Sequence, residues 1–135
     1  MANFSEVACA EIGGDLHVVA LDPDGTLWHT IRFTAQGDWQ PFGNASAAAG
    51  NPNTRFTRIG CANVGGDLHV VGATTTDQIL HTIRFTQAQN WQPWGNLTAV
   101  VGAPPSEVDE RLVALACAGV AGDLHVCCAT TPLIT

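Results

Sequence analysis

The sequence predicts an all-β protein made of two complete repeats and half of a third. Residues 13–19 read Gly-Gly-Asp-Leu-His-Val-Val, and they return unchanged at 65–71 and in altered form at 121–126. Residues 29–34, His-Thr-Ile-Arg-Phe-Thr, return unchanged at 81–86. Both offsets are 52 residues, and the third unit follows 56 residues after the second. Such a period indicates that each unit is one structural module, so every residue is interpreted together with its counterparts.

The first repeat contains four short runs of apolar and β-branched residues. Gly, Pro, Asn and Asp separate these runs, and they are the residues that form turns. We therefore expect a four-stranded antiparallel meander. Its strands are predicted at residues 4–12, 15–21, 26–34 and 39–42.

The second repeat follows the same plan, and the third stops early. Strands of the second repeat are predicted at 56–64, 67–73, 78–86 and 91–94. The third unit supplies only two, at 112–120 and 123–129. The linkers at 45–54 and 97–111 do not repeat well, and residues 45–49 are expected to form at most one helical turn.

A four-stranded meander repeated at this period is the plan of a β-propeller blade. The first strands carry small residues (Ala-Cys-Ala, Gly-Cys-Ala and Ala-Cys-Ala), which fit near a propeller axis. The second strands are almost continuously apolar, as expected of strands covered on both faces. We therefore predict one domain, residues 1–135, with a first blade at 4–44, a second at 56–98 and a half blade at 112–129.

Two and a half blades leave apolar faces without a neighbour. At roughly 25 cal/mol per Å², several hundred Å² of such surface costs on the order of 10 kcal/mol in water. We therefore expect the ring to be completed by oligomerisation of identical chains, or the chain to be part of a longer propeller.

The charge distribution argues against two classes of partner. The chain has a formal charge of −7, contains no Lys and has five basic residues in total. This balance disfavours nucleic acids and anionic membrane surfaces. No apolar run is long enough for a membrane span, and the N-terminal residues do not resemble a secretory signal. Location is left open between the cytoplasm and release without a classical signal.

Two motifs connect the chain to a known family. The run Leu-Trp-His-Thr-Ile-Arg at 27–32 is followed by Trp-Gln-Pro-Phe-Gly at 39–43, and Gly-Gly-Asp-Leu-His-Val-Val precedes both. This combination resembles the blades of bacterial β-propeller lectins of the PLL type and, more loosely, tachylectin-2 and tectonin repeats. The resemblance covers about residues 4–98 and 112–129. It implies a propeller of about seven blades that binds sugars in pockets between blades.

The chain also departs from that family pattern. It has too few blades for a ring. In the second repeat, Thr74-Thr75-Thr76-Asp77 replaces the turn at 22–25, and Leu80 replaces Trp28. If Trp28 belongs to a sugar pocket, the corresponding pocket of the second repeat is defective.

Repeated aromatic residues beside planar polar groups are the main binding candidates. An indole can stack on the apolar C–H face of a sugar, while amide and guanidinium groups bind its hydroxyls. Alternatively, a repeated Trp packs one blade against the next. The candidate sugar-binding residues are Trp28, His29, Arg32, Trp39, Gln40, His81, Arg84, Trp91, Gln92 and Trp94.

For the histidines the sequence favours a structural or pocket-lining role, and for the repeated aspartates and cysteines a structural one. The five histidines recur with the repeat, whereas a metal site needs ligands that converge on one point. Asp15, Asp67 and Asp123 are expected to cap turns, and Cys9, Cys61 and Cys117 to be small buried residues. We therefore expect no metal, no cofactor and no catalysis. The predicted function is carbohydrate binding at repeated weak sites that gain avidity together; the alternatives are a scaffold for protein–protein interaction and a truncated remnant of a longer propeller.

Overall fold

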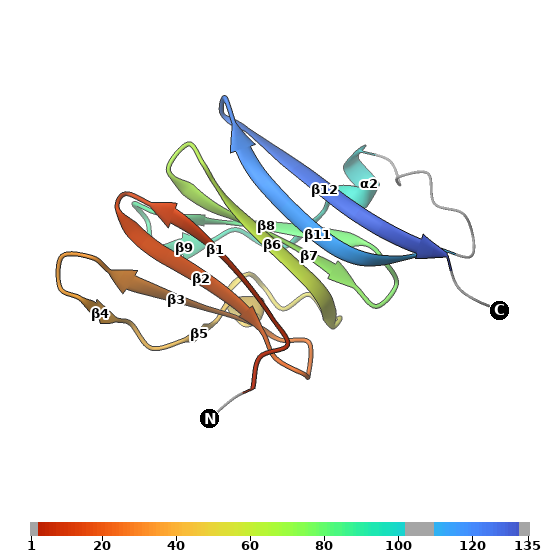
Figure 1. The fold of residues 1–135 in the computed structure, drawn as a ribbon, viewed down its shortest axis with the longest axis horizontal. Coiled ribbons are helices and arrows are strands. Elements are labelled where there is room, and N and C mark those ends of the chain that lie inside the picture. Colours follow the sequence, from red (N-terminus) through yellow and green to blue (C-terminus); the bar gives the residue numbers. More distant parts are fainter. Residues whose placement is uncertain (1–2, 102–109, 133–135) are drawn as a thin grey trace.

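The computed structural model describes residues 3–101 and 110–132, and its sheets are antiparallel throughout (Figure 1). The all-β prediction is confirmed. The first sheet runs β1 (Glu6–Ile12), β2 (Asp15–Leu21), β3 (Leu27–Phe33) and β4 (Asp38–Trp39), and β5 (Gly43–Asn44) also pairs with β3.

The second sheet repeats the first, and a two-stranded hairpin follows it. β6 (Phe56–Val64), β7 (Asp67–Thr74) and β8 (Ile79–Phe85) form the second sheet, where β9 (Asn90–Trp91) and β10 (Gly95–Asn96) both pair with β8. The hairpin consists of β11 (Glu110–Val120) and β12 (Asp123–Pro132). None of the described sheets closes on itself.

The fourth strand of each repeat differs from the prediction. Residues 39–42 and 91–94 were expected to be continuous strands, but each is split into two short pairings on either side of a proline. Pro41 has no N–H to donate to a ladder. The Gln40 N–H still donates to the Ile31 carbonyl (2.9 Å), and the Thr30 hydroxyl donates to the Gln40 carbonyl. The chain therefore stays beside β3 without a regular ladder.

A short helical turn follows each split strand. α1 spans Ala45–Ala48, as expected, and the Asn44 side chain accepts a hydrogen bond from Ala47 N–H (3.0 Å) at its N-terminus. α2 spans Leu97–Val101. In the first repeat the Ser46 hydroxyl accepts a hydrogen bond from Leu27 N–H (3.0 Å), which fixes the turn against the start of β3.

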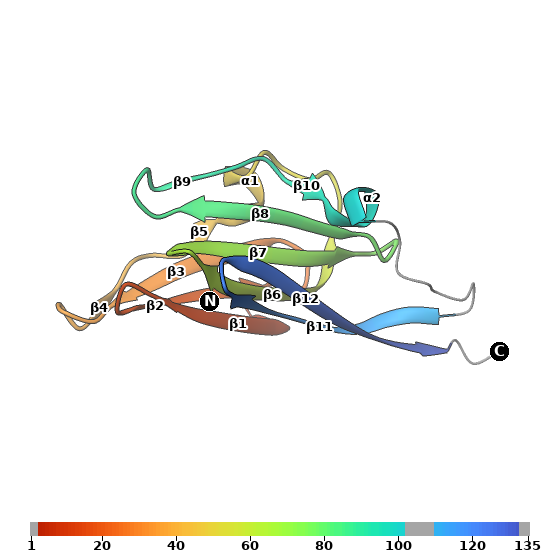
Figure 2. The same cartoon turned by 90° about the horizontal axis from the view of Figure 1, so that it is seen from above.

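The sheets pack face to face through two hydrophobic cores. We call the face that carries Cys9, Cys61 or Cys117 the front face of its sheet or hairpin, and the opposite one the back face. The back face of the first sheet packs on the front face of the second, as Figure 2 shows from above. The back face of the second sheet packs on the front face of the hairpin in the same way.

The three equivalent cysteines illustrate how burial depends on a neighbouring sheet. Cys61 is buried between the first and second sheets, Cys117 is half-buried, and Cys9 is exposed. The prediction that all three are buried is therefore wrong for Cys9, because no other sheet of the described residues packs on its face. Burial raises the pKa of Cys61 to about 12 and that of Cys117 to about 11.

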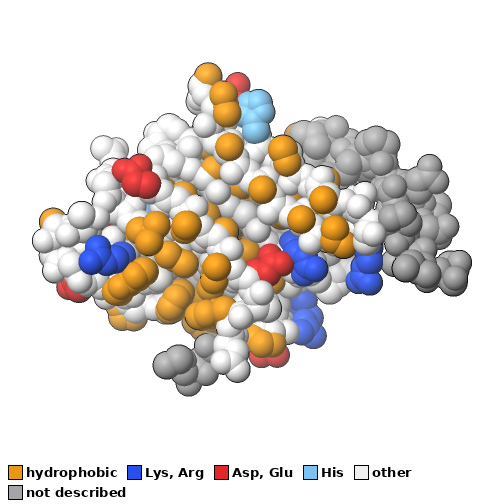
Figure 3. Space-filling model, in the orientation of Figure 1, with side chains coloured by type: hydrophobic (Ala, Val, Ile, Leu, Met, Phe, Trp, Pro, Cys, Tyr) orange, Lys and Arg blue, Asp and Glu red, His pale blue; other side chains and the backbone are white. Residues whose placement is uncertain are grey.

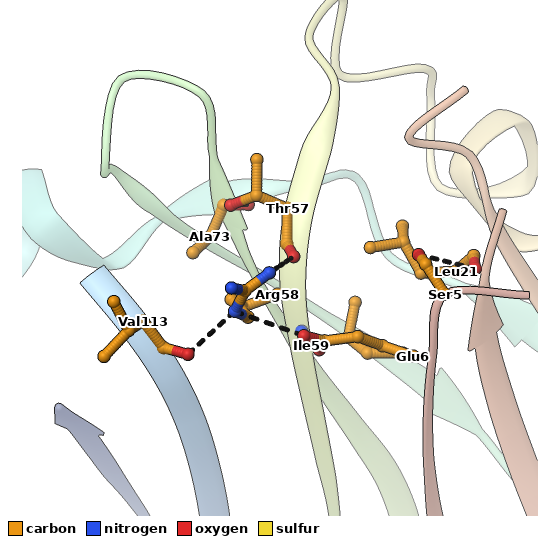
Figure 4. A network of polar contacts seen from close by, with 8 residues as sticks. All are labelled: Ser5, Glu6, Leu21, Thr57, Arg58, Ile59, Ala73 and Val113. Carbon is orange, nitrogen blue, oxygen red and sulfur yellow. Dashed lines mark hydrogen bonds and ion pairs between the residues drawn. The ribbon is translucent and has the colours of Figure 1, made fainter. Parts of the chain in front are cut away.

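One arginine ties all three units together near β1, β6 and β11, which lie side by side (Figures 1 and 4). Arg58 Nε lies 3.2 Å from Glu6 Oε2 of the first sheet and 2.8 Å from the Val113 carbonyl of the hairpin. The other carboxylate oxygen of Glu6 accepts a hydrogen bond from Ile59 N–H (3.2 Å). These bonds connect β1, β6 and β11 and fix their mutual register.

Candidate functional site

A pocket of about 350 Å³ opens between the back face of the first sheet and the front face of the second. It lies beside the turn that joins β1 to β2. The wall from the first sheet consists of Ile12, Gly13, Asp15, His17, Ile31, Phe33 and Gln40. The second sheet contributes Arg84, Thr86 and Gln89. The pocket therefore combines an apolar wall with several polar side chains, and it exists only because two sheets meet.

One lining residue, His17, belongs to a buried pair of histidines. His17 Nδ1 is 3.0 Å from His29 Nε2. One ring nitrogen must donate and the other must accept, so the pair suits two neutral imidazoles with fixed tautomers. The His29 ring also meets the edge of Trp91 from the second sheet, with ring centroids 5.3 Å apart and planes at 83°. This contact couples the histidine pair to the packing of the two sheets.

Burial keeps these histidines uncharged at neutral pH. It lowers the pKa of His17 to about 4, with a further contribution from the positive charge of Arg84. Burial also lowers the pKa of His29 to about 3, and His17 and Arg84 add to the effect. The guanidinium of Arg84 stays charged, because an arginine remains protonated in proteins even where burial lowers its pKa. The pocket thus presents the Arg84 cation near the neutral imidazole of His17, and Asp15 also lines it.

Asp15 and Asp67 were expected to cap the turns that precede them, but each bonds to the end of the third strand instead. Asp15 Oδ1 accepts a hydrogen bond from Thr34 N–H (2.9 Å), and the Thr34 hydroxyl donates to the Gly14 carbonyl. Asp67 and Thr86 make the same contacts in the second sheet. These bonds join the end of the third strand to the turn before the second, which shapes the rim of the pocket.

The second sheet carries an incomplete copy of the site. His69 Nδ1 lies 3.0 Å from His81 Nε2, and burial lowers the pKa of both, that of His81 to about 4. A hollow beside them is lined by Gly65, Gly66, Asp67, Phe85, Thr86, Gln87 and Ala88. The described part of the hairpin has only two strands, so it offers no counterpart of Arg84 to form an opposite wall.

The structure places the ten predicted binding residues in different environments. Gln40 and Arg84 line the pocket. His29 and Trp91 do not line it, but His29 contacts both the lining residue His17 and Trp91. His81 belongs to the second histidine pair. The backbone of Gln92 bonds to Ile83 and Thr82, like that of Gln40 in the first repeat.

Two of the four tryptophans pack away from the pocket. Trp28 Nε1 donates to Asp22 Oδ2 (2.9 Å) in the turn before β3. Trp94 Nε1 donates to the Ser46 carbonyl (3.3 Å), and its ring lies 4.8 Å from that of Phe56. In both positions the indole connects elements of the fold.

The remaining two candidates lie on the open front face of the first sheet. Arg32 and Trp39 are cross-strand partners on β3 and β4, and Trp39 is 54% exposed. Their counterparts Arg84 and Trp91 face the first sheet instead. The same pair of residues therefore forms part of an interface in one repeat and a free surface in the other.

Asp15 was expected only to cap a turn, and His17 to have a structural or pocket-lining role; both line the pocket. The sequence did contain a signal for the histidine pair, namely the spacing of the histidines. Each repeat has two histidines 12 residues apart, at 17 and 29 and again at 69 and 81. That spacing places them on adjacent antiparallel strands, where the rings can meet.

Within residues 3–101 and 110–132, no group of three or more His, Cys, Asp or Glu side chains is arranged to hold a metal ion. Among the helices in that part of the chain, none is long and apolar enough to cross a membrane. No protein-family model matches the sequence, and no curated protein matches it significantly.

The hydrogen bond between Trp28 and Asp22 predicts that the two side chains are energetically coupled in their contributions to the free energy of unfolding. Hydrogen bonds from Trp28, Thr26 and Asp24 lower the pKa of Asp22, although burial acts in the opposite direction. Replacing Trp28 by Phe removes one of these donors, so we expect the free energy of unfolding to fall by about 1 kcal/mol. Urea denaturation of Trp28→Phe, Asp22→Asn and the double variant measures this coupling. Additive effects of the two substitutions would contradict it.

Proposed function

We propose that this chain is a non-catalytic carbohydrate-binding module of the lectin type, and that its sheets are blades of a β-propeller. The pocket between the first and second sheets is the proposed binding site. The observation that carries the proposal is that Arg84 and Gln40 line this pocket together with the apolar side chains of Ile12, Ile31 and Phe33. Each of the two residues comes from a different sheet.

The chemistry of the pocket suits a sugar. A pyranose has an apolar C–H face, which Ile31 and Phe33 can cover, and hydroxyl groups that need polar partners. The Gln40 amide both donates and accepts hydrogen bonds, and the Arg84 guanidinium donates up to five. A volume of about 350 Å³ lies at the small end of ligand sites, which favours one or two sugar units.

The propeller proposal is supported by the repeated order of strands and the repeated mode of packing. At both internal boundaries, the back face of one unit packs on the front face of the next. The strands β1, β6 and β11 lie side by side. Units stacked in this way around an axis generate a propeller. Pockets at successive unit boundaries would then repeat around the ring, and weak sites would gain avidity.

The lining of the pocket gives little support to hydrolysis. Acid–base cleavage of glycosides uses two carboxyl groups at a defined separation. Among the described residues that line this pocket, Asp15 is the one carboxylate, and it already accepts a hydrogen bond from the backbone of Thr34. A scaffold role is the second candidate, and the exposed apolar front face of the first sheet favours it.

A glycan array followed by titration calorimetry tests the proposed site. For a sugar found on the array, we expect Gln40→Ala to weaken binding about tenfold and Arg84→Ala to weaken it further, because both remove hydrogen-bond donors. Gln92→Ala is the matched control, since Gln92 occupies the same place in a sheet without a complete pocket. Equal affinities of wild type, Gln40→Ala and Arg84→Ala would refute the site. An array without any hit would favour the scaffold.

A further inference from the structure

The front face of the first sheet has the sequence pattern of a buried interface, although no other sheet of the described residues packs on it and several of its large side chains are exposed. Val7 is 69% exposed and Leu16 is 36% exposed, whereas their counterparts Ile59 and Leu68 are 4% and 0% exposed. Figure 3 shows hydrophobic side chains gathered over the first sheet. In the second sheet the same pattern is covered by the back face of the first. The first sheet has the same docking surface and no unit against it.

The back face of the hairpin is the complementary free surface. Ala116, Ala118, Val120 and Cys127 are all exposed, and Val120 is 53% exposed. In the first sheet, Ala8, Ala10, Ile12 and Val19 hold the same positions and pack in the core against the second sheet. The described residues therefore leave one front face and one back face uncovered.

We infer that a second copy of this chain docks head to tail, with the front face of its first sheet on the back face of the hairpin. A front face on a back face is the packing that the chain already forms at both of its internal boundaries. The new contact continues that established interface by one further step. A second copy is thus the occupant that reproduces the existing packing without any new type of contact.

The repeat also predicts the register of this contact. A Cβ atom placed on Gly60 would lie 3.5 Å from the Cys117 sulfur, where the second sheet meets the hairpin. One unit further along, Ala116 corresponds to Gly60, and Cys9 of the second copy corresponds to Cys117. Cys9 of the second copy should therefore lie against Ala116.

The same register would add polar residues to the contact. Arg84 faces the wall that contains Asp15 and His17. In the docked pair, Arg32 of the second copy would face Asp123 and His125, which are exposed in the single chain. The contact is heterologous, so it leads to a closed ring or to an open filament. The association itself does not depend on sugar binding.

Light scattering coupled to size-exclusion chromatography tests the association. We expect the wild-type chain to elute at a multiple of its 14.1 kDa mass across the micromolar range. Val7→Glu places a charge at the centre of the contact on a side chain that is exposed in the single chain, so we expect a folded monomer. Thr75→Glu is the matched control at an exposed turn residue away from both faces, and it should leave the mass unchanged. A wild-type monomer would overturn the inference, as would an oligomer that Val7→Glu does not dissociate.

Disulfide trapping tests the register independently. In a Cys127→Ser, Cys128→Ser background, Ala116→Cys introduces a thiol opposite the native Cys9 of a second copy. Mild oxidation should give a dimer or a ladder on a non-reducing gel, and Cys9→Ser should abolish it. Cross-linking that persists without Cys9 would exclude this arrangement. Since no ligand is added, a negative result here leaves the carbohydrate-binding proposal untouched.

Discussion

Replacing Leu68 by alanine is expected to lower the free energy of unfolding by about 2–5 kcal/mol, the usual cost of truncating a buried leucine. Leu68 is fully buried on the front face of the second sheet, in the core that joins it to the first. Its removal creates a cavity between two sheets rather than within one. The loss should therefore appear both in global denaturation by urea and in weaker docking of the sheets.

Leu16→Ala is the matched control. Leu16 lies at the same position of the same heptapeptide, but it is 36% exposed because no sheet covers the first front face. In the dissociated chain, we expect this substitution to lower the free energy of unfolding by only about 1 kcal/mol, because Leu16 is partly exposed. Denaturation in dilute solution measures both variants. Equal losses at Leu16 and Leu68 would mean that the two front faces are equally buried, contrary to the structure.

The second large effect is a loss of stability in mild acid. Four histidines have a folded-state pKa below the ordinary value of 6.5, chiefly because of burial; they are His17, His29, His69 and His81. As pH falls from about 6.5 toward 4, the unfolded chain binds protons at His17, His29 and His81, whereas the folded chain, in which these pKa values are about 4 or lower, largely does not. The pKa of His69 is lowered in the same direction. The free energy of unfolding therefore falls, by up to about 1.4 kcal/mol per pH unit for each histidine.

Urea denaturation at a series of pH values between 7 and 4.5 measures this slope. Asp22, whose folded-state pKa is lowered, contributes a loss of stability that begins as pH falls to the ordinary carboxyl pKa of 3.8 and continues toward the lowered folded-state value, so it lies largely below the pH range of this measurement. A His17→Gln, His29→Gln variant should be less stable at pH 7 and should show a shallower slope, because the most deeply buried pair no longer titrates. A slope as steep as that of wild type would show that other groups cause the acid sensitivity.

The candidate site shows how a repeated sequence produces a site that neither repeat holds alone. Gln40 belongs to the first repeat and Arg84 to the second, and the pocket that contains both lies at their boundary. His29 and Trp91 contact each other across the same boundary. Substitutions that weaken the docking of the sheets should therefore weaken ligand binding as well, even where they do not touch the pocket.

Most of the local structure follows from the sequence alone. Turn-forming residues at Gly13-Gly14 and at 22–25 place the ends of β1, β2 and β3, because few other residues adopt those backbone conformations. The expected second strand at 15–21 and the first strand of the second repeat at 56–64 match β2 and β6 residue for residue. The split fourth strand was missed, although the sequence shows the reason for it: Pro41 and Pro93 cannot donate to a ladder. The bonds that instead hold Gln40 beside β3 depend on the tertiary structure.

Burial and the role of each side chain are determined by the tertiary structure. The repeated sequences give Leu16 and Leu68, or Trp39 and Trp91, the same local preferences, and the first two repeats accordingly form the same strands. What differs is the neighbour: a sheet covers the second member of each pair, and water covers the first in the single chain. Packing between units is non-local, and stacked repeats bury a surface only where an adjacent unit exists. The sequence by itself thus determines the repeated unit, whereas the order of stacking decides which residues form the core, the pocket and the free faces.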